Sequence, residues 1–219
     1  MAMMQGVQLL DTMGVDQTPA SAARVSFHAE NREMDARDEK LIRYLAKHQH
    51  SSPFEHVTAR FAITCPLYVA RQIMRHRTFS YNEVSRRYTS EDLAFEVPEK
   101  LRHQSTQSLQ CSDPDLEVED QEELISMIEM NNLRALNLYQ DLLDCGVARE
   151  QARAVLPQGL LTSFWMTGNL WNWSRFLRLR LDGHAQPEAQ IVAQSIYDAL
   201  YEKFPVCISS LLPRLDHHD

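Results

Sequence analysis

The densest group of reactive side chains in this sequence is RHRTFSYNEVSRRY, residues 75–88. It combines four arginines and a histidine with hydroxyl groups, an amide and one carboxylate. A guanidinium group can donate two parallel hydrogen bonds to phosphate oxygens, so this composition predicts a site for a phosphate or diphosphate. Composition alone leaves a second interpretation open, in which the segment is a solvated basic turn whose charges pair with one another.

The rest of the chain makes this segment stand out. The protein has 219 residues and a formal net charge of -8, which argues against non-specific nucleic-acid binding. In such an acidic protein, the five arginines between residues 71 and 87 indicate a local anion site. Only six glycines are present, and neither GxGxxG nor GxxxxGK[ST] occurs, which argues against a Rossmann or P-loop nucleotide site. His48, His50 and His56 lack the spacing of a HExxH helix, so we expect no metal.

The expected location is the cytoplasm, with no membrane partner. No apolar run approaches the roughly 20 residues of a membrane span, and the N-terminus lacks the pattern of a signal peptide. The four cysteines are scattered without a CxxC pair, which is typical of reduced thiols in a cytosolic protein.

Hydrophobic periodicity predicts a single α+β domain over residues 1–219, with helices around a small antiparallel sheet. A strand is expected at 57–64 because apolar and polar residues alternate there, and a second strand is expected at 160–167. Residues 78–88 and 105–120 are expected to be loops, the second of them mobile. Gly146 is expected at the C′ position of a long helix. The predicted helices are 38–48, 67–75, 119–143, 149–156, 169–181 and 187–204.

The arginine segment resembles the signature RHRxxSxNxxSxRY of the flavin-dependent thymidylate synthases, and every fixed position matches. Other segments resemble the same family in the same order, so the resemblance runs from about residue 20 to 205. These segments are 22–27, 50–56, 70–72, Ala152-Arg153 with Leu156-Pro157, Gly168-Asn169, and Leu179-Arg180 with His184-Ala185.

The resemblance implies an enzyme that methylates dUMP to dTMP. Methylenetetrahydrofolate would supply the carbon, NADPH would reduce a bound FAD, and a homotetramer would assemble the site between subunits. The implied FAD residues are Ser52, Arg75, His76, Arg77, Glu83, Asn169 and Arg175. The implied dUMP residues are Gln72, Arg75, Glu83, Ser85, Arg86, Arg87, Arg153 and Arg180.

Among these, Arg180 is the implied catalytic residue, placed beside the uracil ring. A fixed cation there would stabilise negative charge that develops on the pyrimidine, although a surface arginine of a helix is the simpler interpretation of Arg180 by itself. Ser85 is expected to bind phosphate. A covalent nucleophile is the alternative, with His50 or His56 as its base. No cysteine lies in a matched motif, so no thiolate nucleophile is expected.

Two positions depart from the family pattern, namely Trp171 and Arg175 in the flavin segment. Stacking on Trp171, or the charge of Arg175, could replace the missing contact. The three tryptophans 165, 171 and 173 favour core packing, with a ring near flavin or folate as the alternative. Two rival functions also remain at this point. One is a non-catalytic flavin- and nucleotide-binding protein, and the other is a module that binds RNA or phosphopeptides.

Overall fold

The computed structural model describes residues 6–25, 33–91, 93–106, 108–113 and 116–213. The chain forms two compact units. We call Thr64–Arg75 with Asn82–Phe164 the α5 unit, and Val7–Ile63 with His76–Tyr81 and the residues from Trp165 onward the α8 unit. Each unit combines helices with strand residues, which confirms the α+β class. The prediction of a single domain over residues 1–219 stays a prediction.

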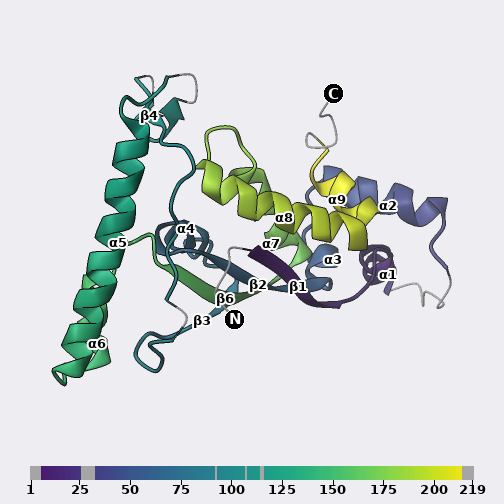
Figure 1. The fold of residues 1–219 in the computed structure, drawn as a ribbon. Coiled ribbons are helices and arrows are strands. Elements are labelled where there is room, and N and C mark those ends of the chain that lie inside the picture. The colour runs from purple at the N-terminus through teal and green to yellow at the C-terminus, as the bar shows by residue number, and fades with distance from the viewer. Residues whose placement is uncertain (1–5, 26–32, 92, 107, 114–115, 214–219) are drawn as a thin grey trace. The chain divides into compact units, whose positions relative to one another are not determined.

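The main sheet has four strands in the order β1-β2-β6-β3 (Figure 1). Its strands are β1 (Gly6–Met13), β2 (Thr58–Pro66), β6 (Leu161–Asn169) and β3 (Ser80–Glu83). The predicted alternation is confirmed on β2, where Ala59, Phe61 and Ile63 are buried and the residues between them are partly exposed. One face of this strand is therefore a core face.

In the α5 unit, the short helix α4 (Leu67–Ile73) follows β2 directly, and Pro66 is its N-cap residue. The long helix α5 (Gln121–Asp144) is followed by its C-cap residue Cys145 and by Gly146, whose φ of 82° and bond from its N–H to the Leu143 carbonyl confirm the predicted C′ position. Then come α6 (Arg149–Ala152) and a 3₁₀ turn (Arg153–Val155). A small core centred on Tyr139 holds these elements together.

In the described part of the α8 unit, six helices pack around the core. They are α1 (Thr18–Ala23), α2 (Ala36–Lys47), α3 (Ser52–Glu55), α7 (Leu170–Arg180), α8 (Pro187–Lys203) and α9 (Pro205–Leu211). Helix α2 packs against α9, and α7 packs against α8. The fully buried Trp173 of α7 lies 5.0 Å from Phe61 between ring centroids, and its indole N–H donates to the Gly168 carbonyl. This tryptophan is a core residue.

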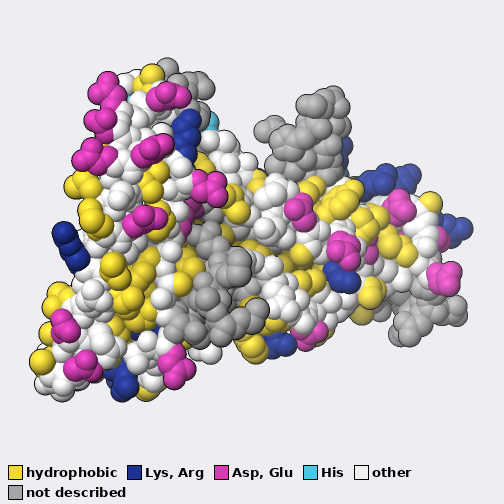
Figure 2. All heavy atoms as spheres, in the orientation of Figure 1, with side chains coloured by type: hydrophobic (Ala, Val, Ile, Leu, Met, Phe, Trp, Pro, Cys, Tyr) yellow, Lys and Arg dark blue, Asp and Glu magenta, His cyan; other side chains and the backbone are white. Residues whose placement is uncertain are grey.

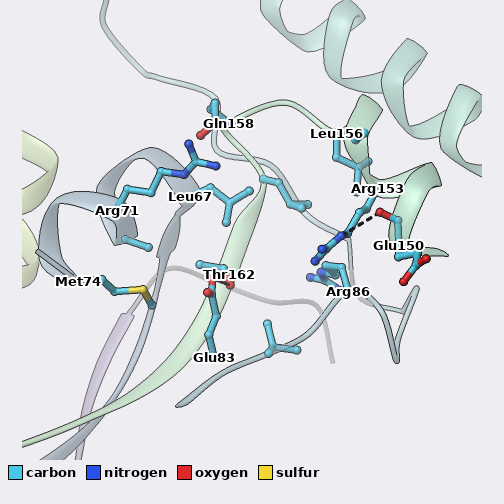
Figure 3. A pocket seen from close by; sticks show the side chains of 14 residues that line it. Leu67, Arg71, Met74, Glu83, Arg86, Glu150, Arg153, Leu156, Gln158 and Thr162 are labelled. Atoms are coloured by element: carbon cyan, nitrogen blue, oxygen red, sulfur yellow. Dashed lines mark hydrogen bonds between the residues drawn. The ribbon is translucent and has the colours of Figure 1, made fainter. Parts of the chain in front are cut away.

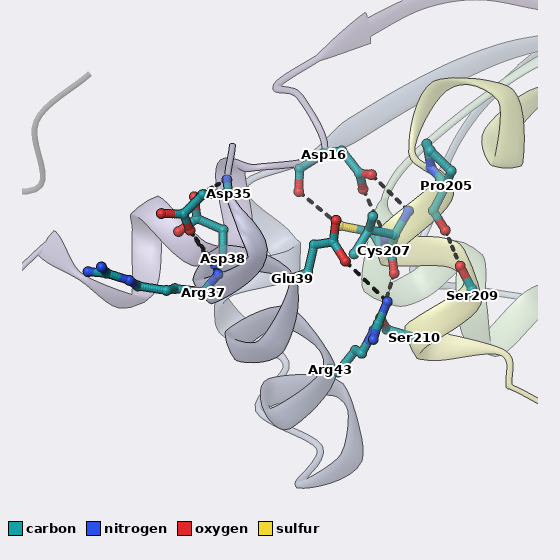
Figure 4. Close-up of polar contacts among 11 residues, drawn as sticks. Asp16, Asp35, Arg37, Asp38, Glu39, Arg43, Pro205, Cys207, Ser209 and Ser210 are labelled. Carbon is teal, nitrogen blue, oxygen red and sulfur yellow. Dashed lines mark hydrogen bonds and ion pairs between the residues drawn. The ribbon is translucent and has the colours of Figure 1, made fainter. Parts of the chain in front are cut away.

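Buried or half-buried carboxylates fix the helix ends of this unit (Figure 4). Both oxygens of Asp16 accept 2.8 Å bonds from the first N–H groups of α9, at Val206 and Cys207. The fully buried Asp38 pairs with Arg24 and accepts from Gln17 at 2.9 Å. Burial raises the pKa of the Asp38 carboxyl, but these hydrogen bonds outweigh burial and lower its pKa to about 2.

Two segments predicted as loops contain short strands. Residues 80–83, inside the segment taken as a loop, form strand β3 at the edge of the main sheet. Within 105–120, the pair Ser112–Asp113 forms β5, which is antiparallel to β4 (His103–Gln104). Both strands are short and polar, so their sequences lack the apolar alternation that reveals a buried strand. Residues 26–27 of one family segment lie outside the described residues.

Strands β1 and β4 and helices α1, α3 and α9 were not predicted, because their segments are short and weakly periodic. Within the described residues, no helix is both long and apolar enough to cross a membrane. All four cysteines are free thiols.

Candidate active site

The signature segment does not belong to one element. Helix α4 ends at Ile73, so Arg75, His76 and Arg77 lie in the turn after it and not on the predicted helix end. Strand β3 follows, and residues 86–88 form another turn. The segment also alternates between the units, because residues 76–81 belong to the α8 unit and its two ends to the α5 unit. Its side chains are therefore divided between the two units.

The α5 unit contains an open cavity of about 540 Å³ that receives side chains from α4, β3, β6 and α6 (Figure 3). Three guanidinium groups line it, those of Arg71, Arg86 and Arg153, together with the carboxylates of Glu83 and Glu150. Figure 3 shows Arg71 on one side and the other two arginines on the opposite side. This excess of cations at a cavity is suited to an anion of the size of a nucleotide.

Arg86 is the most buried of these arginines, with 7% of its surface exposed. Its Nη1 donates to the Glu91 carbonyl at 2.6 Å, and its Nη2 lies 3.5 Å from the Leu161 carbonyl. Arg86 thereby joins the turn after β3 to the first residue of β6. Arg86 thus donates to carbonyl groups inside the protein. Its predicted role in nucleotide binding remains a prediction.

The wall that carries Arg153 is polar and exposed. Arg153 donates from Nε to the Glu150 carbonyl at 3.4 Å, and the Glu150 carboxylate lies 3.9 Å from Nε of Arg87. Ser85 accepts a 3.3 Å bond from the Arg87 N–H, so its hydroxyl helps to form the turn. Among the described residues no histidine hydrogen-bonds Ser85. The weak, exposed pairing of Arg87 leaves it able to exchange Glu150 for a phosphate.

Glu83 reaches into the cavity from the end of β3, and the Thr162 hydroxyl of β6 donates to its Oε1 at 2.6 Å. Thr162 is 3% exposed. The buried Cys65 on β2 is also affected by this carboxylate: burial, and then the charges of Glu83 and Glu96, raise the pKa of the thiol to about 12. Cys65 is therefore protonated at neutral pH and unsuited to nucleophilic attack.

The α8 unit holds a second polar pair, His76 and Arg180. Nε of Arg180 donates to Nε2 of His76 at 3.0 Å, so Nε2 is an acceptor and the ring proton lies on Nδ1. Burial, followed by the charges of Arg180 and Arg175, lowers the pKa of His76 to about 4. The imidazole is thus neutral at physiological pH and orients the guanidinium group.

Aromatic packing fixes the signature in this unit. The buried Phe79 lies 4.5 Å from Trp173 between ring centroids. Phe79 also lies against Gly168, where a Cβ atom would stand 2.4 Å from the ring. Gly168 therefore allows the turn that carries His76 and Arg77 to pack against β6. This requirement gives a physical reason for the glycine at position 168.

The remaining predicted flavin residues also lie in the α8 unit, apart from Arg75 and Glu83. Ser52, Arg77 and Arg175 are exposed, and the Asn169 side chain caps α7 by accepting from the Asn172 N–H at 2.9 Å. The half-buried Trp171 stacks on Phe54 with 6.3 Å between centroids. Trp165 is 50% exposed beneath the Arg60 guanidinium, so core packing holds fully only for Trp173.

The predicted nucleotide residues, apart from Arg180, lie in the α5 unit. The structure brings Glu83, Arg86 and Arg153 together around the cavity. Sequence reasoning placed Arg71 in the arginine-rich stretch without giving it a role of its own, and it did not assign Glu150 or Thr162 to the site. Nothing in the local sequence distinguishes Thr162 from an ordinary strand residue.

The fold and the cavity define an α+β protein equipped to bind a phosphorylated ligand. Comparison with known families makes this specific, because residues 8–206 match the family described as thymidylate synthase complementing protein. The chain belongs to this family. The predicted family resemblance is thereby confirmed.

Individual relatives point the same way. The chain is 40% identical to the flavin-dependent thymidylate synthase of Thermotoga neapolitana over 91% of its own length and 87% of the relative. It is also 40% identical to an enzyme of the same name from Thermus thermophilus, over 91% and 73% of the two chains. A crystal structure of the UMP/dUMP methylase PolB from Streptomyces cacaoi, bound with 5-Br dUMP, superimposes with a TM-score of 0.86 at 32% identity, covering 97% and 96%.

Proposed function

We propose that this protein is a flavin-dependent thymidylate synthase that methylates dUMP to dTMP. Methylenetetrahydrofolate is the proposed carbon donor, and FAD reduced by NADPH is the proposed hydride source. The observation that carries the proposal is the cavity of the α5 unit, where signature residues Glu83 and Arg86 meet Arg153 in a chain of this family. Relatives named for this activity support it.

The cavity supplies what a nucleoside monophosphate requires. Arg153 lines the cavity, and Arg87 lies beside Glu150 of its lining. Both arginines are exposed, and exposed guanidinium groups can form paired bonds with a phosphate without losing a buried partner. Arg86 holds the turn that carries Arg87. We assign Gln72, Arg75, Ser85 and Arg87 to the same nucleotide, and we add Arg71 as a further cation for its anionic groups.

Arg180 is the proposed catalytic residue. Its guanidinium group remains charged at all relevant pH values, and the neutral His76 fixes its direction through the 3.0 Å bond. A cation held in this manner stabilises negative charge that develops on the pyrimidine ring during attack on the one-carbon unit. His76 orients Arg180, and because its imidazole is neutral it does so without the repulsion that a protonated imidazole would exert on the guanidinium group.

The α8 unit has donors that fit a flavin dinucleotide. Arg77, Arg175 and Ser52 are exposed and would hold the diphosphate and its neighbouring groups, together with Arg75. Asn169 and His76 add hydrogen-bonding groups, and Glu83 is assigned to both flavin and nucleotide. A bound flavin supplies the hydride, while the residues of this chain bind and orient the reactants.

A homotetramer is part of the proposal, and helix α5 supports it. Of its 24 residues only Asn132 and Tyr139 are buried. Five large apolar side chains of the helix are 38–59% exposed, namely Leu124, Met127, Met130, Leu133 and Leu138. Figure 2 shows apolar side chains gathered over this helix. Such a surface is typical of an interface between subunits. Light scattering should show a tetramer, and Leu133→Glu should yield smaller species.

A cytoplasmic location is also proposed, because four cysteines without disulfides fit a reducing compartment.

The central experiment measures dTMP formation from dUMP with FAD, NADPH and methylenetetrahydrofolate. Omission of each component in turn should abolish product, and Arg180→Ala should remove it while flavin remains bound. Flavin and dUMP binding without any dTMP in the wild-type protein would leave only a binding protein and contradict the proposal.

A further inference from the structure

The carboxylate of Glu83 has an unusual setting for an exposed side chain. It ends β3 and projects into a cavity that also holds the guanidinium groups of Arg71, Arg86 and Arg153. A glutamate with several rotatable bonds would be expected to turn toward such cations. Among the described residues, however, its side chain forms no ion pair with these arginines, and its hydrogen bond goes to Thr162.

Thr162 is built to hold a fixed position. It lies on β6, next to β3 in the sheet, and is 3% exposed. A β-branched side chain on a strand has few accessible rotamers. The neighbouring bond from the Val84 N–H to the Ser163 carbonyl, at 2.8 Å, fixes the two backbones relative to each other. The paired backbones and the restricted rotamer therefore hold the Thr162 hydroxyl in place beside the Glu83 carboxylate.

The contact itself is strong. A distance of 2.6 Å is that of a hydroxyl donating to an ionised carboxylate, which is among the stronger hydrogen bonds in proteins. Because Oε1 is held by Thr162, the carboxylate keeps its direction, and the exposed Arg71 and Arg153 keep their capacity for an anionic ligand. The Thr162 hydroxyl thus prevents the Glu83 carboxylate from pairing with the arginines of the cavity.

We infer that Thr162 is the positioning residue of this site, acting through its hydroxyl to keep Glu83 oriented toward the nucleotide and away from the cavity's arginines. This inference rests on the proposed function, in which Glu83 contacts nucleotide and flavin. Thr162 itself acts only through Glu83. Its contribution must consequently disappear when the Glu83 carboxylate is absent.

The test compares kcat/KM for dUMP in five proteins: wild type, Thr162→Val, Thr162→Ser, Glu83→Ala and the double variant Thr162→Val with Glu83→Ala. Valine has nearly the shape of threonine without the hydroxyl. We expect Thr162→Val to lower kcat/KM by about ten-fold or more, from the loss of a hydrogen bond to a charged group. Thr162→Ser should stay within about three-fold of wild type, and in the Glu83→Ala background the valine should have no further effect.

A matched control is Thr64→Val, which removes the 2.6 Å bond between the hydroxyls of Thr64 and Ser163, the residue that follows Thr162 on β6. It loses a hydroxyl between β2 and β6 without touching Glu83, and should keep kcat/KM near wild type. If Thr162→Val does not fold, Thr162→Ala takes its place. An equal loss from Thr162→Val with and without Glu83 would show a merely structural role and overturn the inference.

A crystal structure of Thr162→Val separates this inference from the proposed function. The Glu83 carboxylate should leave its wild-type position and turn toward an arginine of the cavity, whether or not the protein makes dTMP. If wild-type protein makes no dTMP, the proposed function fails, and this structural result still decides the role of Thr162. An unchanged Glu83 side chain in the variant would refute the positioning role even in an active enzyme.

Discussion

The bond between His76 and Arg180 allows a quantitative prediction for catalysis. His76→Phe keeps an aromatic ring against Phe176, whose centroid lies 4.9 Å away, but removes the acceptor for Nε of Arg180. A hydrogen bond from an ionised donor contributes roughly 1.5–3 kcal/mol. Both side chains are half-buried, so water can replace part of this bond, and we expect a loss of about 1.5 kcal/mol, the lower end of that range. This corresponds to about a ten-fold fall in kcat/KM.

The assay is dTMP formation at saturating FAD, with flavin affinity measured separately because His76 is also assigned to the flavin. His76→Gln offers an amide oxygen as a substitute acceptor and should recover most of the loss. The reasoning is refuted if His76→Phe retains full kcat/KM, or if the glutamine and phenylalanine variants are equally impaired while both bind flavin normally.

The pKa of His76 adds a pH dependence of defined sign. Its pKa is about 4 in the folded protein and 6.5 ordinarily, so the unfolded chain takes up the proton first as the pH falls. The folded state therefore loses stability between pH 6.5 and 4. Activity should not change on account of this group at neutral pH, and should fall near pH 4, where an imidazolium would repel Arg180. Urea unfolding of wild type and His76→Phe at several pH values measures the first effect.

Three further variants test other parts of the structure. Gly168→Ala would place a methyl group 2.4 Å from the Phe79 ring and should destabilise the protein by about 1–3 kcal/mol in urea unfolding, whereas Gly183→Ala, with open space at its Cβ position, should not. Glu150→Gln removes a negative charge from the cavity and should tighten dUMP binding by about two-fold in calorimetry, less at high salt. Asp38→Asn should remove roughly 2 kcal/mol of stability at neutral pH, because the lowered pKa stabilises the fold above the ordinary value of 3.8 and this contribution disappears toward pH 2.

Each of these three has an outcome that would contradict it. Equal stability of the two alanine variants would mean that the Phe79 ring moves aside at no cost. Weaker dUMP binding in Glu150→Gln would mean that the carboxylate assists the nucleotide instead of competing with it. An Asp38→Asn variant as stable as wild type at neutral pH would mean that the buried ion pair with Arg24 does not stabilise the fold.

The long and periodic elements were predictable because local sequence decides them. Helix α5 and helix α8 agree with their predicted ranges to within about two residues, and Gly146 was identified as a C′ residue from its type and place. Strand β3 was missed. Its polar residues form a strand because β6 offers a partner, and pairing with a distant strand leaves no periodic signal in four residues.

The sequence by itself determined the family and the kinds of residue at the site, since the signature is contiguous and its arginines, hydroxyls and carboxylate are chemically suited to a nucleotide. Only the tertiary structure decided which of them act together. It buried Arg86 between the Glu91 and Leu161 carbonyls, and it brought Thr162 to Glu83 across 79 positions of sequence. It also joined Arg180 to His76 across 104 positions. Such partnerships depend on strand pairing and helix packing between distant segments, and local residue patterns do not encode them.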